Sequence, residues 1–145
     1  MHLEGTYTFN TTQGKLWDLL NDPAILVRTT PGVESLEQTG SDTYQAVLQI
    51  KMGPINSAFN GTLQVTDKNE PESYRLLIEV DGKIGQIKAE GSVQLSGEGD
   101  ETIVNVQSGS QLTGRLASMG QRLLSGVARM FTKQFFTALE SELPN

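Results

Sequence analysis

Few residues in this chain of 145 could carry out catalysis or hold a metal ion. The sequence has one histidine, His2, close to a terminus, and it has no cysteine, so thiolate chemistry and disulfides are excluded. Three carboxylate pairs stand close together in the sequence: Asp18 with Asp22, Asp100 with Glu101, and Glu140 with Glu142. Each pair falls at an expected helix end or turn, where charged groups are ordinarily solvated. No phosphate-binding glycine loop occurs, so the sequence favours binding over catalysis and predicts no metal site.

A basic stripe near the end of the chain is the second group that could do chemistry. Arg115, Arg122, Arg129 and Lys133 recur at helical spacing, and residues 115–139 contain no Asp or Glu. This segment carries +4, so the rest of the chain carries −10 of the net charge of −6. The stripe suits docking on an anionic membrane, where each basic residue adds about 1 kcal/mol, or on an acidic protein partner. It equally suits a solvated outer face, and the overall charge argues against nucleic-acid binding.

The elements that position these residues follow from hydrophobic periodicity. Alternating apolar and polar residues predict a first strand over 3–10, and Thr11 or Thr12 is expected to cap a helix over 13–20. Asp22 and Pro23 are expected to start a second short helix. Further strands are predicted over 33–38, 43–52, 55–66, 74–80, 87–95 and 102–112. One amphipathic helix is predicted from 115 to 143, about 42 Å long at 1.5 Å per residue.

This order of elements predicts one α+β domain over 1–145. Strands joined by short turns form an antiparallel meander, and a helix of that length would lie across the concave face of a curved sheet. At 37% hydrophobic residues the chain is long enough and apolar enough to bury a core. The first residues lack a signal peptide pattern, and no apolar run approaches the roughly 20 residues of a spanning helix. We therefore expect a cytoplasmic protein whose contact with a membrane is peripheral.

Several strand positions expected to face the helix are small, among them Ala89, Gly91, Ser108 and Ser110. Small residues on facing layers either leave a cavity or allow close contact between sheet and helix, and the sequence is compatible with both. For the first case, we expect an apolar ligand to contact two walls. The strand wall comprises Leu48, Ile50, Phe59, Leu63, Leu76, Ile78, Ile87, Val104 and Val106. The helix wall comprises Leu116, Met119, Gly120, Leu123, Val127 and Phe131.

Local motifs along the whole chain resemble a known family. They are Leu-Trp-Asp-Leu-Leu-Asn-Asp-Pro at 16–23, Thr-Pro-Gly-Val-Glu-Ser-Leu-Glu at 30–37 and Phe-Asn-Gly-Thr at 59–62. The most specific motif is Gly-Arg-Leu-Ala-Ser-Met-Gly-Gln-Arg-Leu-Leu-Ser-Gly-Val-Ala at 114–128. With these motifs the chain resembles the helix-grip superfamily of START domains, Bet v 1 allergens and polyketide cyclases. Within it, the chain looks like the CoxG family of carbon monoxide dehydrogenase subunits.

The resemblance implies a fold and a function. It implies a curved sheet of about seven strands, in the order β-α-α-β6-α, wrapped around the C-terminal helix. It implies an apolar ligand, a lipid or a quinone and no covalent cofactor, held between sheet and helix. The expected role is non-enzymatic: an accessory or membrane-recruitment factor of a molybdenum-containing CO dehydrogenase, at the inner face of the cell membrane. Many relatives continue into a membrane-binding tail, whereas this sequence stops at Asn145, so we expect transient docking or a carrier role. A docking module without ligand and a cyclase-like or hydrolase-like enzyme are the alternatives.

Overall fold

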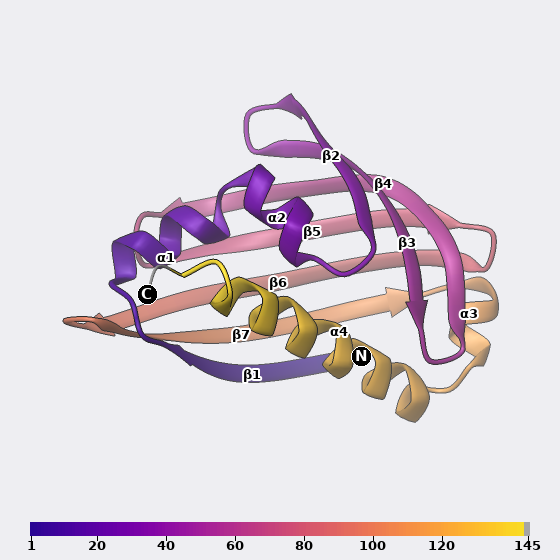
Figure 1. Ribbon diagram of the computed structural model, residues 1–145. Coiled ribbons are helices and arrows are strands. Elements are labelled where there is room, and N and C mark those ends of the chain that lie inside the picture. The colour runs from indigo at the N-terminus through magenta and orange to yellow at the C-terminus, as the bar shows by residue number, and fades with distance from the viewer. Residues whose placement is uncertain (144–145) are drawn as a thin grey trace.

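A computed structural model describes residues 1–143, in which seven antiparallel strands and four helices form the fold (Figure 1). The strands are β1 (His2–Phe9), β2 (Val33–Gly40), β3 (Thr43–Met52), β4 (Ile55–Asn69), β5 (Ser73–Gly82), β6 (Gly85–Glu98) and β7 (Glu101–Leu112). The helices are α1 (Gln13–Leu20), α2 (Pro23–Thr29), α3 (Gly114–Ser118) and α4 (Gln121–Glu140). The sequence end at Asn145, from which we predicted transient docking, lies outside the described residues.

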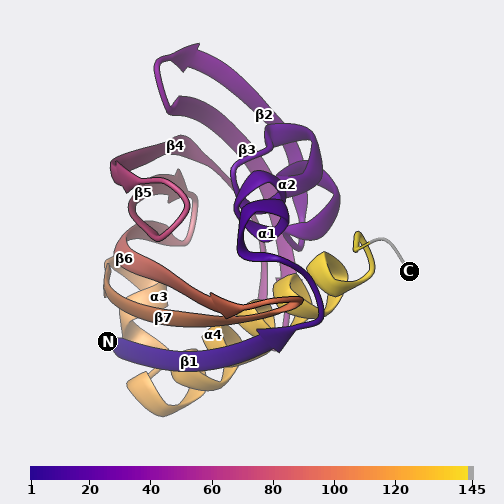
Figure 2. The same ribbon diagram turned by 90° about the vertical axis from the view of Figure 1, so that its left-hand side faces the viewer.

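The seven strands make one curved sheet in the order β1-β7-β6-β5-β4-β3-β2. Strands β2 to β7 form a meander of neighbours in sequence, and β1 adds to it beside β7. Figure 2 shows the sheet curling around α4, which runs along the concave side next to β1, while α1 and α2 close one end. The predicted α+β helix-grip architecture is confirmed.

The two short N-terminal helices begin where their capping residues predict. The Thr12 hydroxyl accepts a hydrogen bond from the Lys15 backbone N–H at 3.4 Å, and the Asp22 carboxylate accepts one from Ala24 N–H at 3.0 Å. Pro23 occupies the first turn of α2, where its missing N–H leaves no partner unsatisfied. These caps set the two helices across one end of the sheet, where α1 contacts β6 and β7.

The predicted single helix over 115–143 is wrong, because the chain breaks between α3 and α4. Gly120 has φ +92°, a conformation that side-chain-bearing residues rarely adopt and that interrupts helical hydrogen bonding. The first piece is held to the β5–β6 turn, since the Leu116 N–H donates to the Ile84 carbonyl at 3.0 Å. Helix α4 then ends at Glu140 rather than at 143. Within the described part of the chain, no helix combines the length and apolar character needed to cross a membrane.

Two glycines of this region should respond oppositely to alanine. Gly120→Ala is expected to lower the free energy of unfolding by about 1–2 kcal/mol, because alanine is strained at positive φ. Gly126→Ala is expected to raise it by up to about 1 kcal/mol, because Gly126 lies inside α4 with open space around its missing Cβ. Urea unfolding followed by circular dichroism measures both changes. Stabilisation by Gly120→Ala would show that α3 and α4 prefer to join.

The core of the protein divides into two hydrophobic clusters at opposite ends of the sheet. The α1 cluster comprises Phe9, Leu16, Trp17, Leu20, Ile25, Tyr74, Val93, Leu95, Val104, Phe136 and Leu139. The α3 cluster comprises Ala46, Leu48, Ile55, Phe59, Val80, Leu116 and Leu124. Helix α4 joins them, since Leu124 near its start belongs to one and Phe136 and Leu139 near its end belong to the other. The strand positions between the clusters are therefore not part of either packed core.

Candidate functional site

The middle of the concave face is built from small residues. Across β6 and β7, Ala89 pairs with Ser110 and Gly91 pairs with Ser108. We call these four residues the small-residue floor. They alternate along their strands with positions on the convex face, so they face inward, yet each keeps part of its surface accessible to solvent. Small side chains and partial exposure at the centre of the sheet indicate that α4 does not close the interior completely.

The floor lies between the two packed ends. Val93, two residues along β6, belongs to the α1 cluster, whereas Ile87, two residues the other way, packs against the α3 cluster. Leu63 on β4 and Phe131 on α4 are partly buried and belong to neither cluster. The floor, Leu63 and Phe131 therefore border an interior space that apolar groups of a ligand could occupy. We call this region the central interior.

Most residues predicted to line a cavity contribute instead to packing at its two ends. On the strands, Leu48, Ile50, Phe59, Ile78 and Ile87 are part of the α3 cluster or pack against it, and Leu76, Val104 and Val106 relate in the same way to the α1 cluster. On the helical side, Leu116, Met119 and Val127 also pack in the α3 cluster. The apolar periodicity identified these residues as inward-facing but could not separate packed core from open interior.

Two predicted wall residues do not face the interior. Leu123 is 46% exposed on the outer side of α4, and Gly120 is exposed at the helix break. The prediction placed both on the apolar side because it treated 115–143 as one continuous helix. Once α4 restarts at Gln121, its buried side is defined by Leu124, Phe136 and Leu139, and Leu123 falls away from it.

The basic stripe is divided by the same break. Arg115 lies on α3, whereas Arg122, Arg129 and Lys133 lie on α4, and all four are exposed. Arg129 lies at the seam between α4 and β1, where it lines a small pocket. A shallow groove on the outer side of α4 is lined by Met130, Lys133, Gln134, Thr137 and Ala138. Basic and apolar groups therefore share one outer surface of α4.

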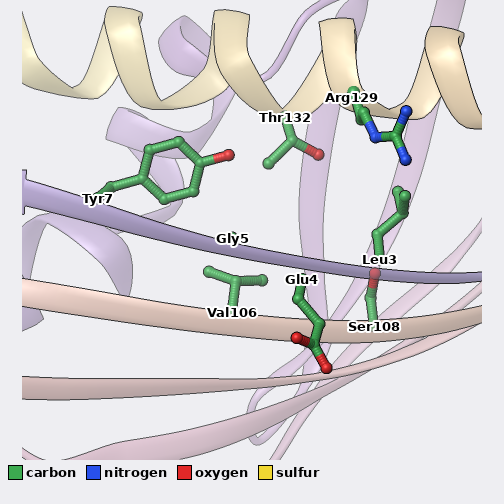
Figure 3. Close-up of a pocket in the computed structure, with 8 residues that line it drawn as sticks. All are labelled: Leu3, Glu4, Gly5, Tyr7, Val106, Ser108, Arg129 and Thr132. Carbon is green, nitrogen blue, oxygen red and sulfur yellow. The ribbon is translucent and has the colours of Figure 1, made fainter.

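The pocket at the seam is the opening that the sequence analysis missed. It has a volume of about 60 Å³ and is lined by Leu3, Glu4, Gly5, Tyr7, Val106, Ser108, Arg129 and Thr132 (Figure 3). Strand alternation placed Leu3, Gly5 and Tyr7 on the inner side of β1. Nothing in the sequence indicated which helix turn would lie above them, because that depends on how the sheet curls.

The carboxylates of the chain are all at the surface. Every Asp and Glu within residues 1–143 is exposed or half-buried, and no group of His, Asp and Glu in this range is arranged to hold a metal ion. His2 Nε2 lies 3.0 Å from Glu4 Oε1 in an exposed pair. Glu142 accepts two hydrogen bonds from Arg28, at 2.6 Å from Nη2 and 3.1 Å from Nε, which tie the end of the chain to α2. These carboxylates therefore serve surface contacts.

The buried phenol of Tyr74 predicts a dependence of stability on pH. Tyr74 packs edge-on against Trp17, and burial raises the pKa of its hydroxyl above the ordinary value of about 10. The unfolded chain loses this proton first, so the stabilisation is complete below about pH 10 and is lost as pH rises toward the folded-state pKa. Urea unfolding above about pH 10 should show a loss approaching about 1.4 kcal/mol per pH unit. Tyr74→Phe should remove this component, and equal slopes in both proteins would contradict the assignment.

Comparisons with known proteins match this fold over nearly the whole chain. A model of the CoxG family of carbon monoxide dehydrogenase subunits matches residues 5–144. The crystal structure of a conserved protein from Geobacillus kaustophilus is 31% identical, has a TM-score of 0.95, and aligns over 98% of this chain and 94% of that one. A comparison with curated proteins gave no match.

More distant solved structures share the fold alone. A START superfamily protein from Mycobacterium smegmatis is 12% identical with a TM-score of 0.73, over 97% of this chain and 94% of that one. The Zhui aromatase/cyclase from a Streptomyces species is 13% identical with a TM-score of 0.70, over 98% and 92% of the two chains. With the family match over residues 5–144, they establish that the chain belongs to the CoxG family of carbon monoxide dehydrogenase subunits and has a START-type helix-grip fold.

Proposed function

We propose that this protein binds one apolar molecule, a lipid or a quinone, in the central interior between the sheet and α4. The observation that supports this most directly is the small-residue floor, where Ala89, Gly91, Ser108 and Ser110 are paired in register and partly exposed. Protein interiors ordinarily pack at a density near 0.74, so an inward face that keeps accessible surface is a place for a guest molecule.

The surroundings of the floor are suited to an apolar guest. Leu63 and Phe131 present apolar surface beside it, and no Asp, Glu, Lys or Arg occupies an inward position on β6 or β7. Covering apolar surface stabilises a complex by roughly 25 cal/mol per Å². A ligand that covers the floor would therefore gain most of its affinity from burial, whereas polar groups would set its orientation.

Extraction of the purified protein with organic solvent, followed by mass spectrometry, tests this function. We expect a lipid or quinone to co-extract with the protein, and we expect delipidated protein to take up added quinone or lipid and quench or shift the fluorescence of Trp17. Repeated extractions without any apolar molecule, together with no uptake of added quinone or lipid, would rule the function out.

We further propose that the bound molecule serves a molybdenum-containing CO dehydrogenase, to which this chain is a non-enzymatic accessory. The name of the family supports this role. The likeness to aromatase/cyclases rests on 13% identity and carries no activity to this chain. Co-purification of the chain with such an enzyme, and faster reduction of quinone when the loaded protein is added, are the expected results. No association and no effect on quinone reduction would contradict the role.

The outer side of α4 supports docking on an anionic membrane as a second function. Leu123 and Met130, each 46% exposed and one heptad apart, lie next to the basic residues Arg122 and Lys133. Exposed apolar and basic groups on one helix favour the interface of an anionic bilayer. The protein should sediment with vesicles of phosphatidylglycerol and phosphatidylcholine but less with phosphatidylcholine alone. Arg122→Glu combined with Lys133→Glu should abolish the difference, whereas Lys15→Glu on α1 should not. Unchanged binding by the double variant would reject this surface.

A further inference from the structure

The pocket at the seam between β1 and α4 combines apolar walls with unpaired polar groups. Leu3 and Val106 supply apolar surface, whereas Tyr7, Ser108 and Arg129 supply a phenol, a hydroxyl and a guanidinium. In Figure 3 the Arg129 side chain extends from α4 toward Leu3 on β1, with Ser108 below. The volume of about 60 Å³ accommodates a few water molecules or a small polar group, and it is too small for a whole lipid or quinone.

The polar groups of this pocket have few partners in the protein. Thr132 is occupied, since its hydroxyl donates to the Ala128 carbonyl at 2.8 Å. Within residues 1–143, Arg129 makes no ion pair within 4.0 Å, and neither Tyr7 nor Ser108 uses its hydroxyl in a side-chain hydrogen bond. The carboxylate of Glu4 points away from Arg129 in Figure 3 and is paired with His2. The pocket therefore offers hydrogen-bond donors, including one permanent positive charge, to a group from outside the protein.

The pocket is continuous with the central interior. Ser108 belongs both to the seam pocket and to the small-residue floor, and it pairs with Leu3 on one side and Gly91 on the other. The absence of a side chain at Gly5 leaves room for Tyr7, because a Cβ there would lie 2.9 Å from the tyrosine ring. A molecule lying on the floor would thus reach the surface of the protein at Arg129.

Resting on the function proposed above, we infer that the seam between β1 and α4 holds the head of the ligand and that Arg129 binds it as an anion. The ligand class is a single-chain amphiphile with a carboxylate head, whose apolar chain lies on the small-residue floor. A guanidinium binds a carboxylate through two parallel N–H···O hydrogen bonds and stays charged at all physiological pH values. The hydroxyls of Tyr7 and Ser108 are positioned to donate to the same head.

Titration of delipidated protein with laurate and with lauryl alcohol tests the assignment, because the two probes share one chain and differ only in head charge. Wild-type protein should bind laurate about tenfold more tightly than lauryl alcohol, the ratio expected for one charge-assisted hydrogen-bonded pair. The ratio should fall as salt concentration rises, because the side chain of Arg129 is exposed.

Arg129→Gln should weaken binding of laurate about tenfold and leave binding of lauryl alcohol unchanged. Arg122→Gln, on the same helix but outside the pocket, is the matched control and should change neither. Equal affinities of wild-type protein for the two probes, or an unchanged laurate affinity in Arg129→Gln, would overturn the role of Arg129 while leaving the apolar site intact. Failure of both probes to bind wild-type protein would instead overturn the proposed function itself.

Discussion

Ala89→Phe is expected to lower the affinity for an apolar ligand about 100-fold. Ala89 is central in the small-residue floor, between Ile78 on β5 and Ser110 on β7. A phenyl ring at this position would displace about three or four methylene groups of the ligand, each worth about 0.8 kcal/mol. Because each 1.4 kcal/mol corresponds to about a tenfold change, the combined loss is about 100-fold. Fluorescence titration of delipidated protein with quinone or laurate measures it.

The stability of the same variant separates an open interior from a packed one. An added ring in a well-packed core costs about 1–3 kcal/mol, whereas a ring that fills accessible space costs nothing or stabilises. We therefore expect the thermal midpoint of Ala89→Phe to be unchanged or higher. Gln107→Phe, on the convex face of β7, is the control and should affect neither binding nor stability. A destabilised Ala89→Phe that still binds ligand would show that the floor is packed against α4.

Phe136→Ala should lower the free energy of unfolding by about 3–5 kcal/mol, the largest effect expected from a single substitution in α4. Phe136 is 5% exposed and lies in the α1 cluster. Its ring stacks on Tyr7 with centroids 4.0 Å apart and also contacts Phe9 and Phe135. Its removal would leave a cavity between α4 and β1, and these aromatic contacts would be lost with it. Urea unfolding followed by circular dichroism measures the change.

Phe131→Ala is the matched comparison, because it removes the same side chain from the same helix. Phe131 is partly buried and belongs to neither cluster, so its loss should cost only about 1 kcal/mol of stability. It should instead weaken ligand binding, since Phe131 borders the central interior. Similar destabilisation by the two variants would contradict the division of the core into two clusters, and Phe136→Leu provides a milder variant that retains most of the packing.

Much of the fold could be predicted because the relevant signals are local. Alternation along each strand gave the inward and outward positions, and short polar turns gave the meander. Thr12 and Asp22 with Pro23 marked the starts of α1 and α2, because capping depends on hydrogen bonds within two or three residues. The resemblance of motifs along the chain added the family, which the match over residues 5–144 confirms.

The helix break at Gly120 could not be predicted, because a glycine within a helical pattern costs only about 1 kcal/mol and is often tolerated. What decides the break is the attachment of Leu116 to the β5–β6 turn and of Leu124 to the α3 cluster. The same event turned Leu123 outward and separated Arg115 from the basic residues of α4.

By itself, the sequence determined which side chains face inward, which element follows which, and that the grip helix carries a basic surface. Only the tertiary structure decided which inward residues pack and which leave room, and it brought Arg129 of α4 to Ser108 and Tyr7 at the seam. The physical reason is that periodicity along a chain fixes the direction of a side chain. The distance between two layers depends on how the sheet curls and where the helix breaks.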